Sequence, residues 1–557
     1  MRAPFKTQLA ACICATLTFA STALGADMAD KVYLNGRIWT GGSTGELSQA
    51  IAIEGERLVA VGPTATIKSR IGPKTEVVEL NGAFVTPGFI DAHVHFIEGG
   101  ISLGHVDLRD AKTPQEFASR IAAAARQKPP GEWVLYGAWD HEMWGGELPD
   151  RNWIDKETSN TPVYVTRLDG HMALANSLAL KLAGIDEKTP DPPGGTIVRD
   201  AKGRPTGVLK DEAQSLMKIP EESMDQVDRA LQTAMTHAAS RGVTQVHDMA
   251  MGTWRSLEAY RRARDRDALR VRIYSFVPLA DWQRMAEYVR THGRGDDWLR
   301  WGGLKGYVDG SLGSTTAWFH QPYTDDPKTS GLILVAPDEQ RRRIVNADRA
   351  GLHVVIHAIG DRANDWLLDT YKSVAAENGP RDRRFRIEHA QHLSPTAAAQ
   401  FASQGVIASM QPYHAIDDGR WAEKRIGPER LKGTYAFRSL LDAKALLAFG
   451  SDWPVAPLDP LEGIYAAVTR RTIDGANPDG WQPQQKITVE EAVRAYTQAD
   501  AYAGYQEKSV GKLEPGYLAD FVVLSANLFE TEPVNIPKLE VLRTVVGGRA
   551  VFIKQGE

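Results

Sequence analysis

Residues Val85–His95 read Val-Thr-Pro-Gly-Phe-Ile-Asp-Ala-His-Val-His, an apolar run that ends in two histidines one residue apart. Side chains alternate along a strand with a period of two, so His93 and His95 point the same way. Seven later apolar runs alternate with amphipathic segments, as parallel strand–helix units do. These runs are Val243–His247, Val271–Phe276, Leu304–Asp309, His353–His357, Phe385–His389, Val406–Gln411 and Leu446–Asp452. Together the eight runs predict an α/β fold, a TIM-like (β/α)8 barrel.

The two ends of the chain differ from this middle part. Short apolar runs with hairpin signals, such as Glu54-Gly55-Glu56 and Gly547-Gly548, predict β-strands at both ends. We therefore expect a composite β-sandwich formed by residues 26–86 and 509–557, with the barrel at residues 87–508. The stretch from His95 to Val243 is too long for one crossover. An insertion after barrel strand 1 is expected there, at about residues 100–225.

Residues 1–25 have the pattern of a secretory signal peptide. Arg2 and Lys6 precede the apolar run Leu9–Ala20, and Ala23-Leu24-Gly25 supplies small residues for cleavage. The alternative is an uncleaved membrane anchor, but the run is shorter than the ~20 residues that span a bilayer. We expect export across the inner membrane to the periplasm, with no stable membrane insertion after cleavage.

Composition narrows the class of protein further. The chain has 557 residues, 43% hydrophobic and 24% charged, which is typical of globular proteins and excludes wholesale disorder. Its net charge of −5 gives no electrostatic case for nucleic-acid binding. Its two cysteines, Cys12 and Cys14, fall within the predicted signal peptide. The mature chain would therefore have no disulfide, thiol nucleophile or zinc–thiolate site.

Polar residues that bind metals stand at the ends of several predicted strands. A His-x-His motif alone is weak, because histidines also cap strands and fill cores. In a parallel barrel, however, the carboxyl ends of all strands face one mouth. Imidazole together with carboxylate suits a divalent transition metal, most plausibly Zn2+. The residues expected to bind it there are His93, His95, His357, His389 and Asp452, and Lys305 and His247 are expected to face the same mouth.

Six segments carry a family resemblance: Thr86–His95, Leu304–Ser311, His357–Asp361, Arg386–Gln391, Gly450–Pro454 and Gly511–Asp520. Through them the chain resembles the amidohydrolase superfamily, and within it the amidohydrolase 3 group, which includes N-substituted formamide deformylases. The resemblance covers essentially the whole mature chain. It implies a metal-dependent hydrolase that acts on a small molecule, and it also suggests a homodimer.

The resemblance gives Lys305 a role that spacing alone does not. In relatives, a lysine on barrel strand four can be carboxylated to N6-carboxylysine and bridge two metals. His93, His95, Lys305 and Asp452 would then hold one ion, and Lys305, His357 and His389 the other. The alternative is an ammonium group paired with Asp309 or Glu388, which would leave a site for one ion.

The reaction implied is hydrolysis of a carbon–nitrogen bond, an amide or a formamide-like relative, by a metal-bound hydroxide. Asp452 is expected to carry the proton from the nucleophile to the leaving nitrogen. His389 or His247 would help to polarise the carbonyl, although His247 alternatively makes only a hydrogen bond inside the barrel. A cyclic amide, carbamate or ester would suit the same site. A non-catalytic periplasmic metal- or solute-binding protein is the alternative from another class.

Substrate contacts are expected from the insertion and from the segment after strand seven. Trp139, Asp140 and His171 are the candidates in the insertion, and Tyr413 and Arg425 follow strand seven. Loops over a barrel mouth often supply specificity. The alternatives are that the aromatic residues form a local core and that the residues after strand seven lie on the surface.

Overall fold

The computed structural model describes residues 1, 28–43, 47–129, 131–249 and 254–555. The predicted signal peptide lies outside the described residues apart from Met1. Within the described ranges, eight parallel strands form one sheet. In spatial order they are β7 (Phe89–Val94), β13 (Val243–Met249), β14 (Arg272–Pro278), β15 (Leu299–Tyr307), β16 (His353–Ala358), β17 (Arg386–His389), β18 (Ile407–Met410) and β19 (Leu447–Phe449).

The sheet closes on itself next to its last strand. Val94 at the end of β7 forms a parallel bridge with Trp453, four residues after β19. The His95 amide donates to the Trp453 carbonyl at 2.8 Å, and the Asp452 amide donates to the His93 carbonyl at 2.6 Å. The predicted (β/α)8 barrel is therefore confirmed, and these contacts bring the ends of its first and last strands together.

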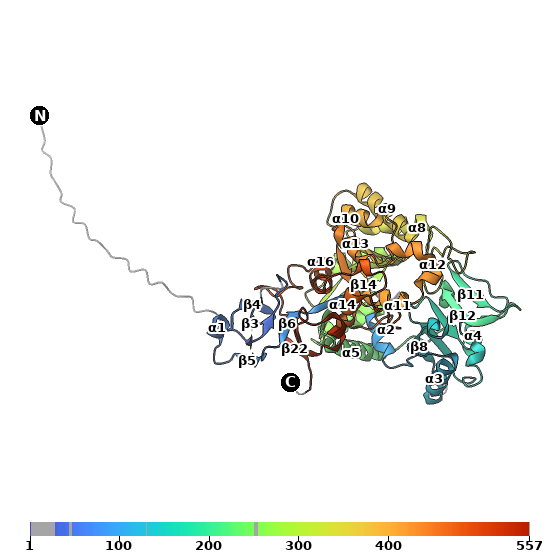
Figure 1. Ribbon diagram of the computed structural model, residues 1–557, viewed down its shortest axis with the longest axis horizontal. Coiled ribbons are helices and arrows are strands. Elements are labelled where there is room, and N and C mark those ends of the chain that lie inside the picture. Colours follow the sequence, from blue (N-terminus) through green and yellow to red (C-terminus); the bar gives the residue numbers. More distant parts are fainter. Residues whose placement is uncertain (2–27, 44–46, 130, 250–253, 556–557) are drawn as a thin grey trace.

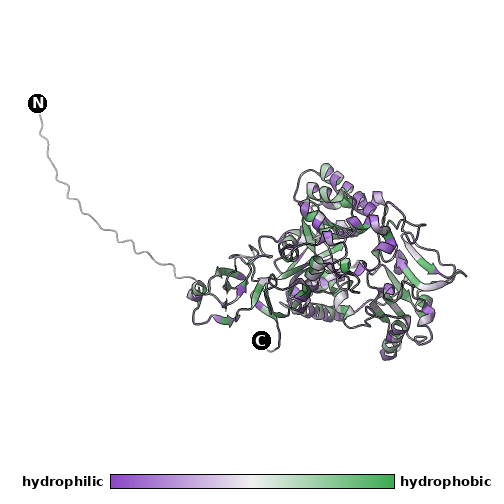
Figure 2. Ribbon diagram, in the orientation of Figure 1, coloured by the Kyte–Doolittle hydropathy of each residue, from purple (hydrophilic) through white to green (hydrophobic). Residues whose placement is uncertain are grey.

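Helices surround the barrel sheet (Figure 1). α5 begins with a capping box, in which Ser223 and Gln226 satisfy each other's backbone amides, and it buries Val227, Leu231 and Met235. Figure 2 shows hydrophobic residues along the central strands and hydrophilic ones on the outer helices. The helices are α5 (Met224–Ser240), α6 (Arg255–Asp265), α7 (Trp282–His292), α8 (Pro337–Arg349), α9 (Asp361–Asn378), α10 (Ala397–Gln404), α13 (Phe437–Asp442) and α14 (Pro460–Thr469).

The first predicted strand is in fact two strands that belong to different sheets. β6 (Phe84–Pro87) pairs antiparallel with β20 (Phe521–Leu524), whereas β7 pairs parallel with β13 in the barrel. Gly88 lies between them, and a Cβ there would come within 2.2 Å of the Thr244 side chain. The chain can pass from one sheet to the other at this point because glycine has no side chain to clash.

Strands from both ends of the chain share one sheet, in the order β2-β6-β20-β21-β22. A second sheet, in the order β4-β3-β1-β5, packs beside it, and the Tyr33 and Phe521 rings meet edge to face at 4.9 Å. The expected composite of N- and C-terminal strands is thus present. The bounds are β1 (Lys31–Leu34), β2 (Arg37–Ile38), β3 (Ala50–Glu54), β4 (Arg57–Gly62), β5 (Glu76–Glu79), β21 (Val541–Val546) and β22 (Arg549–Ile553).

A separate sheet lies between β7 and α5 in the chain, at the opposite end of the molecule from the composite sheets (Figure 1). Its strands follow the order β11-β12-β10-β9-β8. Phe117 packs against Trp144 at 5.4 Å and against Trp139 at 6.2 Å, so this region has an aromatic core of its own. Its elements are α3 (Pro114–Gln127), β8 (Val134–Trp139), β9 (Val163–Arg167), β10 (Met172–Ala175), α4 (Ser177–Ala183), β11 (Gly195–Arg199) and β12 (Pro205–Asp211).

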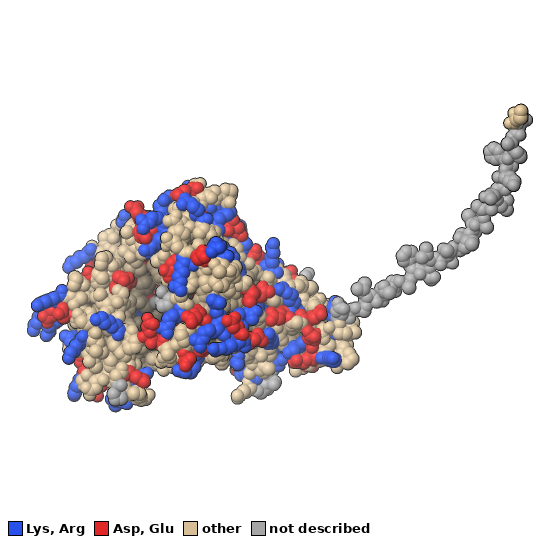
Figure 3. Space-filling view, turned by 180° about the vertical axis from the view of Figure 1, so that it is seen from behind, with Lys and Arg blue, Asp and Glu red and all other residues tan. Residues whose placement is uncertain are grey.

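The surface shows no large field of one sign in the view of Figure 3, where basic and acidic side chains are interspersed. Among the described residues, no helix combines the length and the apolar character needed to cross a membrane.

Candidate metal centre

His93, His95 and Asp452 converge at the carboxyl end of the barrel. His93 is on β7, and His95 directly precedes α2 (Phe96–Ser102). Asp452 follows β19 in a left-handed conformation, with φ of 62°. Its Oδ1 lies 3.0 Å from His95 Nε2 and 3.4 Å from His93 Nε2. The side chains of all three are at least nine-tenths buried, so two imidazoles and one carboxylate oxygen face a common point away from bulk water.

The neighbours of the histidines fix which ring nitrogen is free. A histidine whose Nδ1 faces an oxygen acceptor carries its proton there and leaves Nε2 available as a ligand. Three histidines have this arrangement: His93 with Glu388 Oε2 at 2.6 Å, His95 with the Met249 carbonyl at 2.9 Å, and His389 with Gln411 Oε1 at 2.8 Å. His357 is the reverse, since its Nε2 faces the Gly310 carbonyl at 3.0 Å, which leaves Nδ1 as the ring nitrogen that could bind a metal.

Electrostatics prepares this cluster to bind a cation. Burial lowers the pKa of His93 and of His389, which favours the unprotonated form that binds a metal. Burial alone would raise the pKa of Asp452, but the facing His93 and His95 outweigh it and hold that pKa far below its usual range. Burial also lowers the pKa of His95, yet its hydrogen bond to Asp452 outweighs this and raises it. A bound cation would replace that proton, and the donor set fits a divalent metal.

Lys305 lies on β15 beside these residues. Its Nζ is 3.1 Å from His93 Nε2, and burial lowers its pKa to about 8. Like His357 and His389, it faces the cavity at the barrel mouth. The rings of His357 and His389 are 4.5 Å apart. The structure thus brings all six predicted metal ligands to one end of the barrel.

His414 belongs to the same cluster and was not predicted. It lies on α11 (Pro412–Asp418), directly after β18. Ring nitrogens of His389 and His414 and a carboxylate oxygen of Asp452 all lie within 4.8 Å of one another. His414 stands three residues beyond the end of a predicted strand, so a search that included the first helical turn after each strand would have found it.

His247 does not reach the mouth, contrary to the prediction of a catalytic role. β13 continues past it to Met249, and it is the Met249 carbonyl that faces His95. His247 is fully buried within the barrel, with Nδ1 3.0 Å from Arg386 Nη1 and Nε2 3.2 Å from the Gln245 amide. These hydrogen bonds agree with the alternative interpretation, in which His247 makes only hydrogen bonds inside the barrel.

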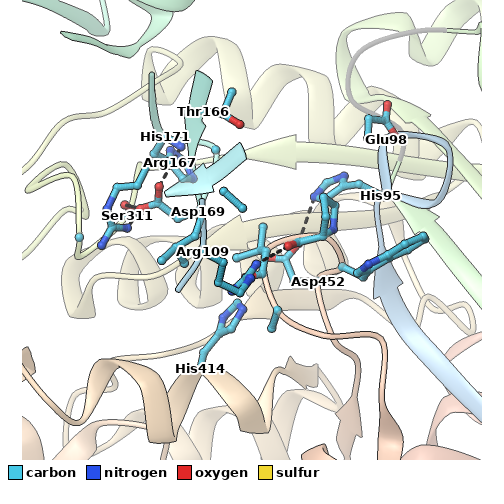
Figure 4. Close-up of a pocket in the computed structure, with 18 of the residues that line it drawn as sticks. His95, Glu98, Arg109, Thr166, Arg167, Asp169, His171, Ser311, His414 and Asp452 are labelled. Carbon is cyan, nitrogen blue, oxygen red and sulfur yellow. Dashed lines mark hydrogen bonds and ion pairs between the residues drawn. The ribbon is translucent and has the colours of Figure 1, made fainter. Parts of the chain in front are cut away.

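A cavity of about 730 Å³ lies over these groups. His95 and Asp452 enter it from the barrel, His414 from α11, and His171 and Asp169 from the insertion (Figure 4). Much of the remaining wall is apolar. Its apolar residues include Leu103, Val106, Tyr307, Leu312, Leu334, Ile359, Trp421 and Val455. A cavity of this size and lining suits a small organic molecule with an apolar part.

Of the five predicted substrate contacts, His171 is among the cavity-lining residues. Its Nδ1 is 2.7 Å from Asp211 Oδ1, which orients the ring. Trp139 is instead fully buried in the insertion core and donates to the Val165 carbonyl at 2.8 Å. It is therefore part of the local aromatic core that was the alternative interpretation.

The other three predicted contacts also lie outside the cavity lining. Asp140 accepts hydrogen bonds from Arg167 at 3.2 Å and from Arg420 at 2.8 Å. Arg425 pairs with Glu142 at 2.8 Å. Tyr413 is half-buried next to His414. The charged pairs of Asp140 with Arg420 and of Arg425 with Glu142 hold the insertion against the segment after β18.

A polar wall that the sequence did not indicate faces the metal donors. Arg167 pairs with Asp169 at 2.8 Å, and Asp169 accepts a hydrogen bond from Ser311 at 2.5 Å. Arg109 donates to the Val455 carbonyl at 2.6 Å, which ties the insertion to the loop after Asp452. These contacts join the insertion to the barrel around the cavity.

A parallel barrel whose mouth gathers imidazole and carboxylate ligands beneath a cavity is typical of metal-dependent hydrolases. Residues 76–552 match the model of the amidohydrolase family, and the chain belongs to that family.

Curated relatives and solved structures agree with this assignment. The chain is 43% identical to Protein LONG AFTER FAR-RED 3 of Arabidopsis thaliana, over 94% of this chain and 92% of that one. It is 30% identical to the N-substituted formamide deformylase of Arthrobacter pascens, over 95% of this chain and 99% of that one. A metal-dependent hydrolase from Pyrococcus horikoshii has a TM-score of 0.73 and 29% identity, and covers 90% of this chain and 99% of its own.

Proposed function

We propose that this amidohydrolase cleaves a carbon–nitrogen bond, a non-peptide amide or formamide-like group, in a small molecule. The observation that carries the proposal is the convergence of His93, His95 and Asp452, of which His95 and Asp452 line a cavity of about 730 Å³. The similarity to an N-substituted formamide deformylase favours a carbon–nitrogen bond.

The cation proposed for this site is Zn2+, as one ion or two. A bound divalent metal lowers the pKa of a water molecule to about 7 and polarises a carbonyl oxygen. Imidazole and carboxylate donors without thiolates suit zinc. Glu388 and the Met249 carbonyl hold the rings of His93 and His95 in the orientation that points Nε2 at the shared site.

Asp452 is proposed as the proton carrier. Its carboxylate is ionised and faces the cavity, and its Oδ1 lies 3.0 Å from His95 Nε2 and 3.4 Å from His93 Nε2. It would accept a proton from the attacking water and return it to the leaving nitrogen.

We also propose that Lys305 is carboxylated. Its lowered pKa of about 8 leaves a fraction of the amine neutral near physiological pH, which carboxylation requires. A buried ammonium beside a divalent cation would be repelled, whereas a carbamate would offer two oxygens to one or two ions. Carbon-13 NMR of protein equilibrated with labelled carbon dioxide would detect the carbamate carbon, and it would be absent from the Lys305→Met variant.

We further propose a cellular location and an oligomeric state for the protein. A periplasmic location is supported by the pattern of residues 1–25, and a homodimer by the family resemblance. Fractionation of cells that express the full chain, and light scattering of the purified protein, test these two points. Protein found in the cytoplasmic fraction would contradict the periplasmic location, and a monomer at all concentrations would contradict the homodimer.

The catalytic proposal is tested with zinc-reconstituted protein and a substrate panel. The panel holds one apolar side group constant and varies the scissile group: formamide, acyl amide, cyclic amide, carbamate and ester. We expect the formamide or acyl amide to be cleaved fastest, and the activity to be lost with a chelator and restored with zinc. Preference for the ester, or turnover that persists without metal, would contradict the proposal.

A further inference from the structure

The Nε2 atom of His414 lies beside the proposed reaction centre without a hydrogen-bond partner among the described residues. This atom is buried. The ring comes from α11 and points towards Asp452 (Figure 4). A buried polar atom without a partner is energetically unfavourable, so its presence in a residue that lines a cavity indicates a ligand that supplies the missing partner.

The surroundings of the ring determine what His414 offers. The Gln391 amide nitrogen lies 3.5 Å from His414 Nδ1 and donates towards it. A neutral ring that accepts at Nδ1 carries its proton on Nε2. The nearby Asp452 carboxylate favours the same arrangement, because a lone pair facing the carboxylate would be repelled. His414, whose side chain is among those that line the cavity, therefore carries its N–H group at Nε2.

Three other cationic side chains on the cavity wall are already engaged. Arg109 donates to the Val455 carbonyl, Arg167 pairs with Asp169, and Lys305 contacts His93. Ring nitrogens of His105 and Trp421 also lack partners in the described residues. Unlike these two, His414 belongs to the cluster with His389 and Asp452, where the bond would be broken.

We propose that His414 is a catalytic residue that donates its Nε2–H to the substrate carbonyl oxygen as negative charge develops there. The inference rests on the proposed hydrolysis and adds an oxyanion donor to it. No proton is transferred: the hydrogen bond strengthens as the carbonyl carbon becomes tetrahedral. The donor is placed before reaction by α11 and Gln391, so little reorganisation is needed.

The test compares two substitutions at this position. His414→Leu removes the donor, and we expect kcat to fall by about 10²–10³-fold with KM little changed. His414→Gln keeps an N–H near the position of Nε2 and should restore a large part of that loss. Zinc content should stay at the wild-type value in both variants. The matched control is His320→Leu, the same change at a half-exposed histidine that pairs with Asp365 outside the cavity lining.

A second readout does not depend on knowing the substrate. Methylphosphonate mimics a tetrahedral oxyanion, and its binding to zinc-loaded protein can be followed by calorimetry. We expect His414→Leu to weaken it by on the order of tenfold or more, and His414→Gln to weaken it less. This result would support the donor role even if the substrate panel failed and the proposed carbon–nitrogen hydrolysis were wrong.

Two outcomes would overturn the inference. If His414→Leu lost zinc, the residue would be a metal ligand and not a donor to substrate. If His414→Leu kept wild-type kcat and wild-type methylphosphonate affinity, the N–H would have no role in the reaction.

Discussion

Glu388→Gln tests whether the buried carboxylate behind His93 controls metal binding. Glu388 is fully buried and accepts hydrogen bonds from Arg386 at 2.8 and 3.0 Å and from His93 Nδ1 at 2.6 Å. Glutamine keeps the shape but removes the charge. Arg386 would then be a buried cation without its counter-ion, a loss of about 3–5 kcal/mol by comparison with other broken buried pairs.

The same change acts on the metal through His93. A carboxylate behind a metal-binding histidine orients the ring and increases its basicity, and its removal lowers metal affinity by about 10–100-fold. Arg386 also donates to the Ala92 carbonyl and to Ser409, so it stays in place and the barrel is expected to fold. The variant should be less stable and bind zinc more weakly.

The assay pairs zinc competition against a chromophoric chelator with chemical denaturation. The matched control is Glu287→Gln, which removes an exposed carboxylate paired with Arg290 on α7 and should change neither readout. Wild-type zinc affinity together with a wild-type denaturation midpoint in Glu388→Gln would refute the reasoning.

Three further changes give separate tests. Asp452→Asn should lower kcat by about 10²–10⁴-fold while circular dichroism stays unchanged, and substantial turnover would remove its role as proton carrier. Burial lowers the pKa of His392 to about 3. As pH falls below about 6.5, His392 is therefore protonated in the unfolded chain but stays neutral in the native protein, which lowers the stability of the native state. Wild type should therefore lose about 1 kcal/mol more apparent stability than His392→Leu between about pH 7 and 5.5, and parallel pH profiles in urea would count against this. Gly100→Ala would place a Cβ 2.1 Å from the Ala230 carbonyl where α2 meets α5, and should lower the free energy of unfolding by about 1–3 kcal/mol. The control Gly104→Ala, whose Cβ would have its nearest atom at 3.5 Å, should melt at the wild-type temperature.

The barrel was predictable because its strands are buried on both faces. Such strands read as short continuous apolar runs, and each of the eight runs corresponds to a barrel strand. The division of the first run at Gly88 was not predictable, since an apolar run looks the same whether it stays in one sheet or crosses to another. The change of sheet depends on Thr244, which is distant in sequence and fills the space beside Gly88.

The metal ligands were predictable because strand ends meet wherever a parallel barrel forms. His247 was misplaced because the apolar pattern did not show that β13 runs on to Met249, which moves the side chain into the barrel interior. His414 was missed because it stands on a helix after a strand rather than on the strand itself. The sequence could not show whether Trp139 lines the cavity or lies in the core of the insertion, because its contacts with Phe117 and Val165 depend on how the insertion folds.

The most direct measurement is an anomalous difference map, collected at the zinc absorption edge, from crystals of the zinc-reconstituted protein. We expect a peak about 2.0–2.2 Å from His93 Nε2, His95 Nε2 and an Asp452 carboxylate oxygen. A map without density between these three side chains, in crystals grown with saturating zinc, would contradict the metal centre on which the proposed chemistry rests.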